Sequence, residues 1–274
     1  MKELAGRVAA ISGAASGIGR ALAVELTNRG THLALSDVDE IGLAKTAMLC
    51  RSAAVTVTTD IVDVSDHQSV VSWADEVVAQ HGHVNMIFNN AGVSLTRDVE
   101  TQSIDDINWV MKIDFWGVVH GTQAFLPYLR ASGEGHVINI SSVFGLLSIP
   151  TQSAYNAAKF GVRGYTDALR MELDLEGANV SATTVHPGGI KTSIARNGRS
   201  ADPDGNGDRF DKMAMTSPEK AARQIIKAVQ RNRRRALIGP DAVLFDLVAR
   251  LPAVVNHRIV RSVSRRANNE LPRT

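Results

Sequence analysis

Residues 8–28 read VAAISGAASGIGRALAVELTN, in which an apolar strand candidate leads into three glycines and then into a helical pattern. A strand, a glycine turn and a helix in this order are the context that a dinucleotide site requires. The helix start then offers free N–H groups and a positive dipole end to phosphates. Without the flanking strand and helix, the same glycines would indicate an ordinary turn. The residues of this loop that we expect to bind a cofactor are Gly13, Ser16, Gly17, Ile18 and Gly19.

Tyr155 and Lys159 stand four residues apart, and Ser142 lies upstream at the end of an apolar run. Four residues are one helical turn, so both side chains project from one face of a helix. An ammonium beside a phenol favours the phenolate, so we expect Lys159 to make Tyr155 a general acid/base near neutral pH, with Ser142 orienting the reacting oxygen. The competing interpretation is a surface Tyr–Lys pair, against which the independent glycine loop argues.

Together these signals resemble the short-chain dehydrogenase/reductase family, and the likeness extends over roughly residues 5–240. Ser12 stands where the family usually has Thr, a change that keeps the hydroxyl. The segment at 89–92, Asn-Asn-Ala-Gly, matches the one that in the family holds the sheet and cofactor, and Thr192 matches the Thr that bonds the carboxamide. The resemblance implies catalysis by Ser142, Tyr155 and Lys159, and cofactor contacts from Asn90, Ala91, Gly92, Tyr155, Lys159, Pro187, Gly188, Ile190 and Thr192.

Short apolar runs rich in Val and Ile alternate with helical patterns, which indicates βαβ units. Right-handed crossovers then give an α/β, doubly wound, mostly seven-stranded parallel sheet of Rossmann type, with helices on both faces and a ligand crevice at the carboxyl ends of its strands. Strands are expected near 7–12, 32–37, 54–59, 84–89, 136–141, 179–185 and 236–238, and helices near 17–29, 39–51, 66–81, 103–131, 153–176 and 218–231.

The motifs leave room for a single catalytic domain over residues 1–240. Arg196 to Asp211 is rich in Gly, Asp and Asn and is expected to be a loop in a substrate lid that covers about 189–217. The competing interpretation is an insertion of no consequence. Residues 241–274 are expected to form a basic, partly amphipathic C-terminal extension.

The basic charge is concentrated at the end of the chain. From Pro218 onward there are 13 Lys/Arg and 4 Asp/Glu, a net charge of +9. One interpretation is a cationic amphipathic element that makes peripheral contact with anionic lipid. The favoured one is a helix packed on the body or on a partner subunit, with solvated arginines.

Composition excludes several classes. No stretch approaches the ~20 apolar residues of a membrane span, and no N-terminal segment has the form of a secretory signal. The lone Cys50 has no partner for a disulfide or a zinc site, so we expect no metal and a cytoplasmic location. Nucleic acid is not an expected partner, because the basic tail nearly lacks aromatic residues.

Two acidic residues bear on the choice of cofactor. Asp37 ends the second strand, where a carboxylate accepts hydrogen bonds from the adenosine ribose and repels a 2′-phosphate. Neither Ser16 nor Val38 is basic, so NAD is expected rather than NADP. The competing interpretation of Asp37 is a helix cap. Asp63-Val64 matches the family segment that contacts the adenine.

Apolar residues follow both Ser142 and the segment at 89–92. An apolar wall favours a lipophilic alcohol or ketone over a sugar, although these residues would equally serve as core or dimer contacts. The expected substrate contacts are Ser142, Tyr155, Val93, Phe144 and Gly189.

Asp114 is the chemically serious departure from the family pattern, since it occupies the place of an Asn whose backbone carbonyl helps to hold a water bonded to the catalytic Lys. A carboxylate near Lys159 would offset the pull of the ammonium and raise the Tyr155 pKa. We therefore count Asp114 with the catalytic residues; the alternative is that it disrupts the proton relay.

The sequence predicts an NAD(H)-dependent oxidoreductase that interconverts a small-molecule secondary alcohol and a ketone. One alternative is an NADP-dependent 3-oxoacyl thioester reductase. Another, of a different class, is a non-catalytic, nucleotide-sensing member that binds a partner. The resemblance implies a homodimer or homotetramer formed through helix pairing.

Overall fold

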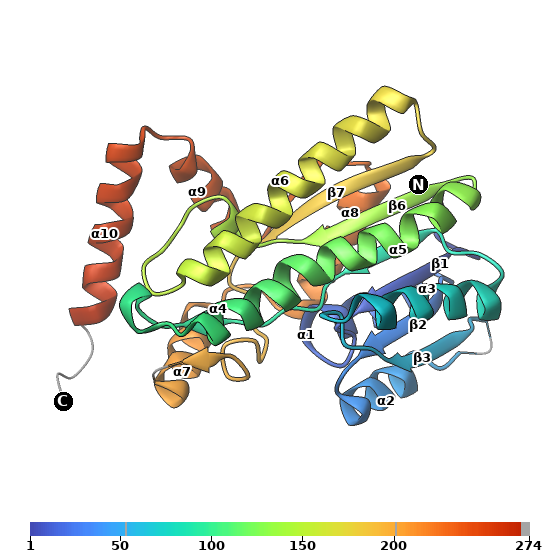
Figure 1. Ribbon diagram of the computed structural model, residues 1–274, viewed down its shortest axis with the longest axis horizontal. Coiled ribbons are helices and arrows are strands. Elements are labelled where there is room, and N and C mark those ends of the chain that lie inside the picture. Colours follow the sequence, from blue (N-terminus) through green and yellow to red (C-terminus); the bar gives the residue numbers. More distant parts are fainter. Residues whose placement is uncertain (53, 201, 270–274) are drawn as a thin grey trace.

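The computed structural model describes residues 1–52, 54–200 and 202–269, and a seven-stranded sheet forms its centre (Figure 1). The strands are β1 (Val8–Ser12), β2 (His32–Asp37), β3 (Val57–Ile61), β4 (Met86–Asn89), β6 (Gly135–Ile140), β7 (Val180–Pro187) and β9 (Arg235–Ile238). Their spatial order is β3-β2-β1-β4-β6-β7-β9, and all neighbours are parallel. The strand order reverses between β1 and β4, which is where a doubly wound sheet opens its ligand crevice. The expected Rossmann-type fold is confirmed.

Helices cover both faces of the sheet (Figure 1). One face carries α1 (Gly17–Thr27), α2 (Glu40–Leu49) and α8 (Pro218–Gln230), and the other carries α3 (His67–His81), α5 (Gly117–Ala131) and α6 (Ser153–Glu176). Successive residues of β1 alternate between the two layers: Ala9 and Ile11 join the first core, Val8 and Ala10 the second. Because both faces are buried, central strands such as β1 and β4 are nearly continuous apolar runs, whereas the edge strand β3, Val-Thr-Thr-Asp-Ile, is only partly buried.

Shorter elements surround the carboxyl ends of the strands. They are β5 (Leu95–Thr96), η1 (Val99–Thr101), α4 (Ile104–Met111), η2 (Lys112–Trp116), η3 (Val143–Gly145), β8 (Arg199–Ser200), α7 (Pro203–Met213), α9 (Pro240–Ala249) and α10 (Ala253–Asn269). A small parallel pairing joins β5 to β8. The segment that follows β4 is thereby fastened to the segment that precedes α7.

The expected helix over 103–131 is interrupted. It consists of α4, the π-helical turn η2 and α5, and the third strand also begins later than expected, at Val57. A π-helical turn widens the helix by one residue and often occurs at functional sites. Here it contains Asp114, whose side chain is fully buried.

The prediction of a loop between Arg196 and Asp211 is wrong for most of its length, because β8 and α7 lie within it. The Asp202 carboxylate accepts a hydrogen bond from the Gly205 N–H, and Pro203 occupies the first turn. An Asp cap followed by Pro is a helix-start signal that outweighs the loop-like composition. The role of this region as a substrate lid stays a prediction.

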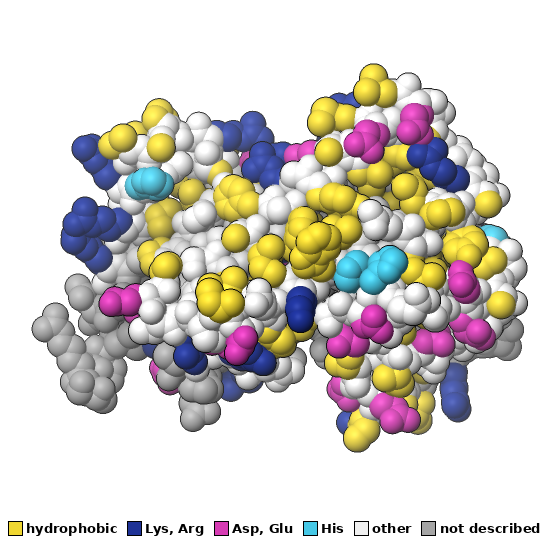
Figure 2. All heavy atoms as spheres, in the orientation of Figure 1, with side chains coloured by type: hydrophobic (Ala, Val, Ile, Leu, Met, Phe, Trp, Pro, Cys, Tyr) yellow, Lys and Arg dark blue, Asp and Glu magenta, His cyan; other side chains and the backbone are white. Residues whose placement is uncertain are grey.

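The last two helices differ in how they pack. α9 contacts β9 and η3, whereas α10 contacts α9 and stands apart from the sheet in Figure 1. Lys and Arg side chains gather over α10 in Figure 2, and residues 253–269 contain no acidic residue. No helix in the described ranges is long and apolar enough to cross a bilayer.

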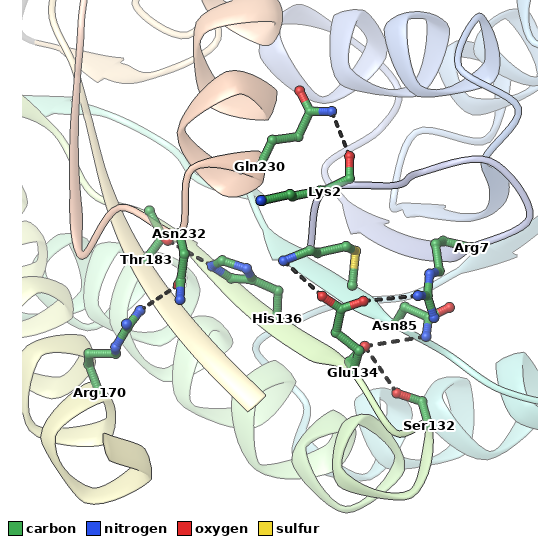
Figure 3. A network of polar contacts seen from close by, with 11 residues as sticks. Lys2, Arg7, Asn85, Ser132, Glu134, His136, Arg170, Thr183, Gln230 and Asn232 are labelled. Carbon is green, nitrogen blue, oxygen red and sulfur yellow. Dashed lines mark hydrogen bonds and ion pairs between the residues drawn. The ribbon is translucent and has the colours of Figure 1, made fainter. Parts of the chain in front are cut away.

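The amino ends of the strands are joined by a polar network (Figure 3). The Glu134 carboxylate pairs with the amino terminus of Met1 and with Arg7, both at 2.9 Å. Nearby, the buried His136 ring lies 2.8 Å from the Thr183 hydroxyl, which donates its only proton to the Arg233 carbonyl. Thr183 must therefore accept from His136 Nε2–H, so Nε2 carries a proton. Burial, the Met1 amino terminus and the Arg170 guanidinium lower the His136 pKa to about 3.

We expect the free energy of unfolding to fall as pH drops below about 6.5, the pKa of an unfolded His. Between that value and the folded pKa of about 3, the unfolded chain binds a proton at His136 and the folded protein does not. Burial likewise lowers the His186 pKa to about 4. Each buried histidine contributes a loss of at most ~1.4 kcal/mol per pH unit.

His136→Gln should reduce this acid sensitivity by about one proton, because Gln can still donate to Thr183 without titrating. Urea unfolding between pH 7 and pH 5 measures the slope. Substitution of the exposed His83 by Gln is the control and should leave the slope unchanged. A His136→Gln slope equal to that of the wild type would contradict the assignment.

Candidate active site

The glycine loop joins β1 to α1 and lies against the segment after β4. Gly13 has φ of +67°, and a Cβ at this position would lie 2.7 Å from the Ala91 Cα. A Cβ at Gly19 would overlap the Gly13 carbonyl oxygen. Neither position can hold a side chain, because its Cβ would clash with the neighbouring backbone. At Gly13 the left-handed backbone conformation also favours glycine.

The first turn of α1 has no side-chain cap. Ser16 is its N-cap residue but makes no capping hydrogen bond, and the turn has no acidic residue. By contrast, α2, α3 and α8 are capped by Asp39, Asp66 and Ser217. Free amides and the positive end of a helix dipole suit a phosphate. The predicted residues Ser16, Gly17, Ile18 and Gly19 thus fit a dinucleotide pyrophosphate.

Ser12 and Asn90 hold the two loops together. The Ser12 hydroxyl accepts hydrogen bonds from the Asn90 and Ala91 amides, both at 3.1 Å. Asn90 Nδ2 donates to the Ser12 and Gly13 carbonyls at 2.9 and 3.1 Å. The Asn90 side chain therefore holds the glycine loop in the structure, and Asn90, Ala91 and Gly92 form the floor between the loop and Lys159.

Asp37 faces the glycine loop. Its Oδ2 accepts from the Ala15 amide at 2.8 Å, while Asp39 caps α2 by accepting from Gly42 at 2.9 Å. The alternative that Asp37 caps the next helix is therefore wrong. Its partly exposed carboxylate stands at the carboxyl end of β2, where a ribose would lie.

Asp63 and Val64 follow β3, at the same edge of the sheet. The exposed Asp63 carboxylate accepts from the Ser65 amide at 2.9 Å. The Val64 carbonyl lies 2.9 Å from His120 Nδ1, which ties this segment to α5. Both residues are placed where they would border an adenine.

The segment after β7 closes the other side of the crevice. Pro187 ends β7, Ile190 is buried, and the Thr192 methyl would lie 3.1 Å from a Cβ on Gly17. The second half of the chain thus meets the glycine loop directly. Gly188 and Thr192 lie where the sequence predicts contacts with the nicotinamide half of a cofactor.

Ser142, Tyr155 and Lys159 are brought together and buried. Lys159 Nζ lies 5.5 Å from the Tyr155 ring centre, and the Ser142 hydroxyl is close enough to Tyr155 to lower the pKa of its phenol. Ser142 also accepts from the Phe144 amide at 3.1 Å, which fixes its hydroxyl at the start of η3. A phenol, a hydroxyl and an ammonium that converge in this way can hold and move a proton on a substrate oxygen.

Asp114 contacts Lys159 directly. Its Oδ2 lies 3.0 Å from Lys159 Nζ, and its Oδ1 accepts from the Val93 amide at 2.8 Å. Lys159 also donates to the Ile140 carbonyl at 3.3 Å. A Cβ on Gly92 would touch both charged groups, at 3.4 to 3.6 Å. The carboxylate expected near Lys159 is therefore a buried ion-pair partner.

The pKa values of these groups are coupled. The pKa of Tyr155 is raised by burial and by Asp114, and it is lowered by Lys159 and Ser142. The net effect is a rise of the Tyr155 pKa. Burial lowers the Lys159 pKa, but Asp114 and Tyr155 raise it, and the net direction is upward. The expectation that Lys159 alone brings Tyr155 toward neutral pH is therefore wrong for this protein, because burial and Asp114 outweigh it.

The substrate side is apolar. The Phe144 ring lies 6.3 Å from Tyr155 and 5.9 Å from Phe245 of α9, both edge to face. Val93 packs on the cluster that contains Tyr155. A Cβ on Gly189 would lie 3.0 Å from the Ala214 Cα, so this residue lies against the segment after α7. Every predicted substrate residue thus lies near Tyr155 or the nicotinamide-side segment.

Sequence reasoning missed two residues of α9, Phe245 and Asp241. The Asp241 carboxylate accepts a hydrogen bond from the Gly189 amide at 2.6 Å. The signal was the segment Gly239-Pro240-Asp241, which is typical of a helix start and marks where α9 meets the site. In the described part of the chain, no three His, Cys, Asp or Glu side chains form a metal-binding group.

Comparison with known proteins agrees with this geometry. A family model described as short chain dehydrogenase matches residues 7–203. The chain is 47% identical over 264 residues to "Putative oxidoreductase SadH" of Mycobacterium tuberculosis, covering 95% of this chain and 96% of that protein. A short-chain dehydrogenase/reductase from Burkholderia phymatum, solved in complex with NAD, superposes with a TM-score of 0.84 at 31% identity, covering 90% of this chain and 94% of that one.

Asp114→Asn should shift the pH profile of alcohol oxidation to lower pH. Asp114 raises the Tyr155 pKa, so removal of its charge lowers that pKa and makes the phenolate available earlier as pH rises. The measurement is kcat against pH for both forms. Loss of a buried ion-pair partner also costs about 3–5 kcal/mol of stability, so circular dichroism must confirm that the variant is folded. Superimposable profiles would show that the carboxylate is electrostatically silent.

Proposed function

The chain belongs to the short-chain dehydrogenase/reductase family, and on this premise we propose that it is an NAD(H)-dependent oxidoreductase that interconverts a secondary alcohol and a ketone. The observation that carries the proposal is the buried convergence of Ser142, Tyr155 and Lys159 beside the uncapped start of α1. The three side chains supply acid/base chemistry at a substrate oxygen, and the start of α1 supplies a phosphate site.

Each side chain has a separate role in oxidation. Tyr155 takes the hydroxyl proton of the alcohol, and Ser142 holds the oxygen in place by a hydrogen bond. The Lys159 ammonium stabilises the phenolate, while the Asp114 carboxylate holds that ammonium in its charged form inside the protein. When bound, the nicotinamide supplies the chemistry of hydride acceptance or donation.

NAD is the proposed cofactor. The Asp37 carboxylate would accept hydrogen bonds from the ribose hydroxyls and repel a 2′-phosphate. The Burkholderia phymatum protein was solved with NAD, which supports the same choice here. NADP, with a 3-oxoacyl thioester as substrate, remains the alternative that the cofactor experiment below separates from it.

The proposed substrate is lipophilic. Phe144 packs edge to face on Tyr155 and on Phe245, and Val93 packs on the same cluster as Tyr155, so the surroundings of Tyr155 supply an apolar wall. An apolar wall contributes about 25 cal/mol per Å² of apolar surface that it removes from water. It offers no set of hydrogen-bond partners for the many hydroxyls of a sugar.

We also propose that the chain pairs with a second copy of itself through α5, α6 and the adjoining turn η2. Exposed hydrophobic side chains mark this face, where Figure 2 shows a yellow patch. They are Trp116, Phe160, Met171 and Leu175. Contiguous exposed apolar surface on a globular protein indicates an interaction site.

Tyr155→Phe should reduce turnover of secondary alcohols by at least about 10³-fold, within the range that general acid–base groups contribute. NADH affinity should stay within a few-fold, because the glycine loop, Asp37 and Lys159 remain. A panel of aliphatic, alicyclic and sterol-like alcohols with NAD measures activity, and NADH fluorescence measures binding. Retained turnover would remove Tyr155 from the mechanism, and no turnover by the wild type on any alcohol or ketone would favour the non-catalytic alternative.

The wild type should prefer NAD over NADP by at least about tenfold in kcat/KM, equivalent to ~1.4 kcal/mol. Asp37→Ala should reduce the ratio of kcat/KM for NAD to kcat/KM for NADP, because the carboxylate that repels a 2′-phosphate is lost. Asp63→Ala is a matched control, since Asp63 lies at the same edge but faces the adenine side. Equal kcat/KM for both cofactors in the wild type would defeat the assignment.

A further inference from the structure

We infer that Asp241, in the first turn of α9, is a positioning residue that holds the loop on the nicotinamide side of the cofactor site. The inference rests on the proposed function, because it assigns a role at the same site. Asp241 follows Gly189, the loop residue that it contacts, by 52 residues, and so links α9 to the reaction centre.

The peptide groups of the loop are held from two sides. The Gly189 N–H donates to Asp241 Oδ2 at 2.6 Å, and the Gly188 N–H donates to the Ile238 carbonyl of β9 at 2.9 Å. The Gly189 carbonyl accepts from the Met215 and Thr216 amides at 3.0 and 3.2 Å. The N–H and the C=O of Gly189 belong to the two peptide groups that flank its Cα, so both peptide groups are held, and among the described residues Asp241 is the one side-chain partner of Gly189.

The surroundings are shaped to fit this carboxylate. A Cβ on Gly188 would overlap the Asp241 carboxylate, and a Cβ on Gly239 would lie 2.6 Å from its Oδ1. The same point lies 2.8 Å from the Thr216 hydroxyl. Asp241 therefore fills space that only glycine leaves open on both segments. A side chain at Gly188 or at Gly239 would therefore displace the Asp241 carboxylate.

The loop leads directly to the predicted cofactor contacts. Ile190 follows Gly189 and pairs with Thr216 in an isolated bridge, and Thr192 lies against Gly17 of the glycine loop. A rotation of the peptide groups at Gly189 would move both Ile190 and Thr192. The adenine half of the site, at Asp37 and Asp63, lies on the other side of β1 and shares no contact with Asp241.

A second contact of α9 supports the assignment. Phe245, one turn after Asp241, packs on Phe144 next to Tyr155. α9 therefore touches both the nicotinamide-side loop and the segment that follows Ser142. Asp241 has no cationic partner within ion-pair distance among the described residues, so its hydrogen bond to Gly189, rather than a salt bridge, is what a substitution would remove.

The test separates the two halves of the cofactor site by binding. Asp241→Ala should weaken binding of the reduced dinucleotide at least tenfold and leave binding of ADP-ribose, which lacks the nicotinamide, within about twofold. Asp241→Asn keeps an oxygen acceptor for Gly189 and should restore dinucleotide binding to within about threefold. Calorimetry and fluorescence measure both ligands, with NADH or NADPH chosen by the preference of the wild type.

Asp246→Asn is the matched control. Asp246 lies on the same helix but pairs with Arg250 and Arg235, away from the loop, so both affinities should be unchanged. Asp241→Ser keeps a small polar residue at the start of the helix, but its side chain is too short to reach Gly189. We expect it to have the same affinities as Asp241→Ala. It replaces the Ala variant in the test if the Ala variant does not fold.

Three outcomes overturn the inference. An equal loss of affinity for the reduced dinucleotide and for ADP-ribose would show that Asp241 has a general structural role. Unchanged dinucleotide affinity in both the Ala and Ser variants would show that Asp241 has no role in binding. In either case the proposed function survives, because the wild type still binds and turns over. A wild type that binds neither dinucleotide would overturn the proposed cofactor site together with this inference.

Discussion

The site depends on a cation that has been taken out of water. Lys159 lies almost fully inside the protein, and an isolated ammonium there would be too costly to keep charged. The Asp114 carboxylate at 3.0 Å and the Ile140 carbonyl compensate it. The π-helical turn η2 contains that carboxylate, and the backbone of Gly92 packs against the pair. Removal of one partner would leave the other buried and unpaired, which is the costly case.

Much of this arrangement could be predicted from the sequence because it depends on local patterns. The strand–glycine–helix pattern at residues 8–28 and the four-residue spacing of Tyr155 and Lys159 gave the fold and placed the candidate catalytic group, and Asp114 was correctly expected beside the lysine. The raising effect of Asp114 on the Tyr155 pKa was predicted, but the contribution of burial, which is the largest, was not, because burial depends on the packed structure. α7 was missed because glycine-rich composition obscured the Asp202-Pro203 helix start. The contact of Asp241 with Gly189 joins segments 52 residues apart, and no spacing within either segment indicates it.

The two ends of the sheet divide stability from chemistry. At the amino ends, the Glu134 carboxylate and the His136 ring have their hydrogen-bond partners within the protein (Figure 3). At the carboxyl ends, the first amides of α1 have no capping partner and charged groups are buried in pairs. Parallel strands make this division natural, because all their carboxyl ends meet at one edge. Changes at the amino edge are therefore expected to alter stability, whereas changes at the carboxyl edge alter the chemistry and, at the buried Asp114–Lys159 pair, stability as well.

The uncapped start of α1 also has a thermodynamic consequence. The N-termini of α2 and α3 are capped by the side chains of Asp39 and Asp66, whereas the first turn of α1 has no side-chain cap and leaves its amides available to phosphate oxygens. A dinucleotide that binds only the folded chain stabilises it by about 2.7 kcal/mol at a concentration one hundred times its Kd. Binding of the dinucleotide therefore shifts the folding equilibrium toward the folded protein, in addition to its part in the reaction. A shortage of nucleotide would lower the population of intact protein, so that resistance to heat and proteolysis reports cofactor supply before any substrate is present.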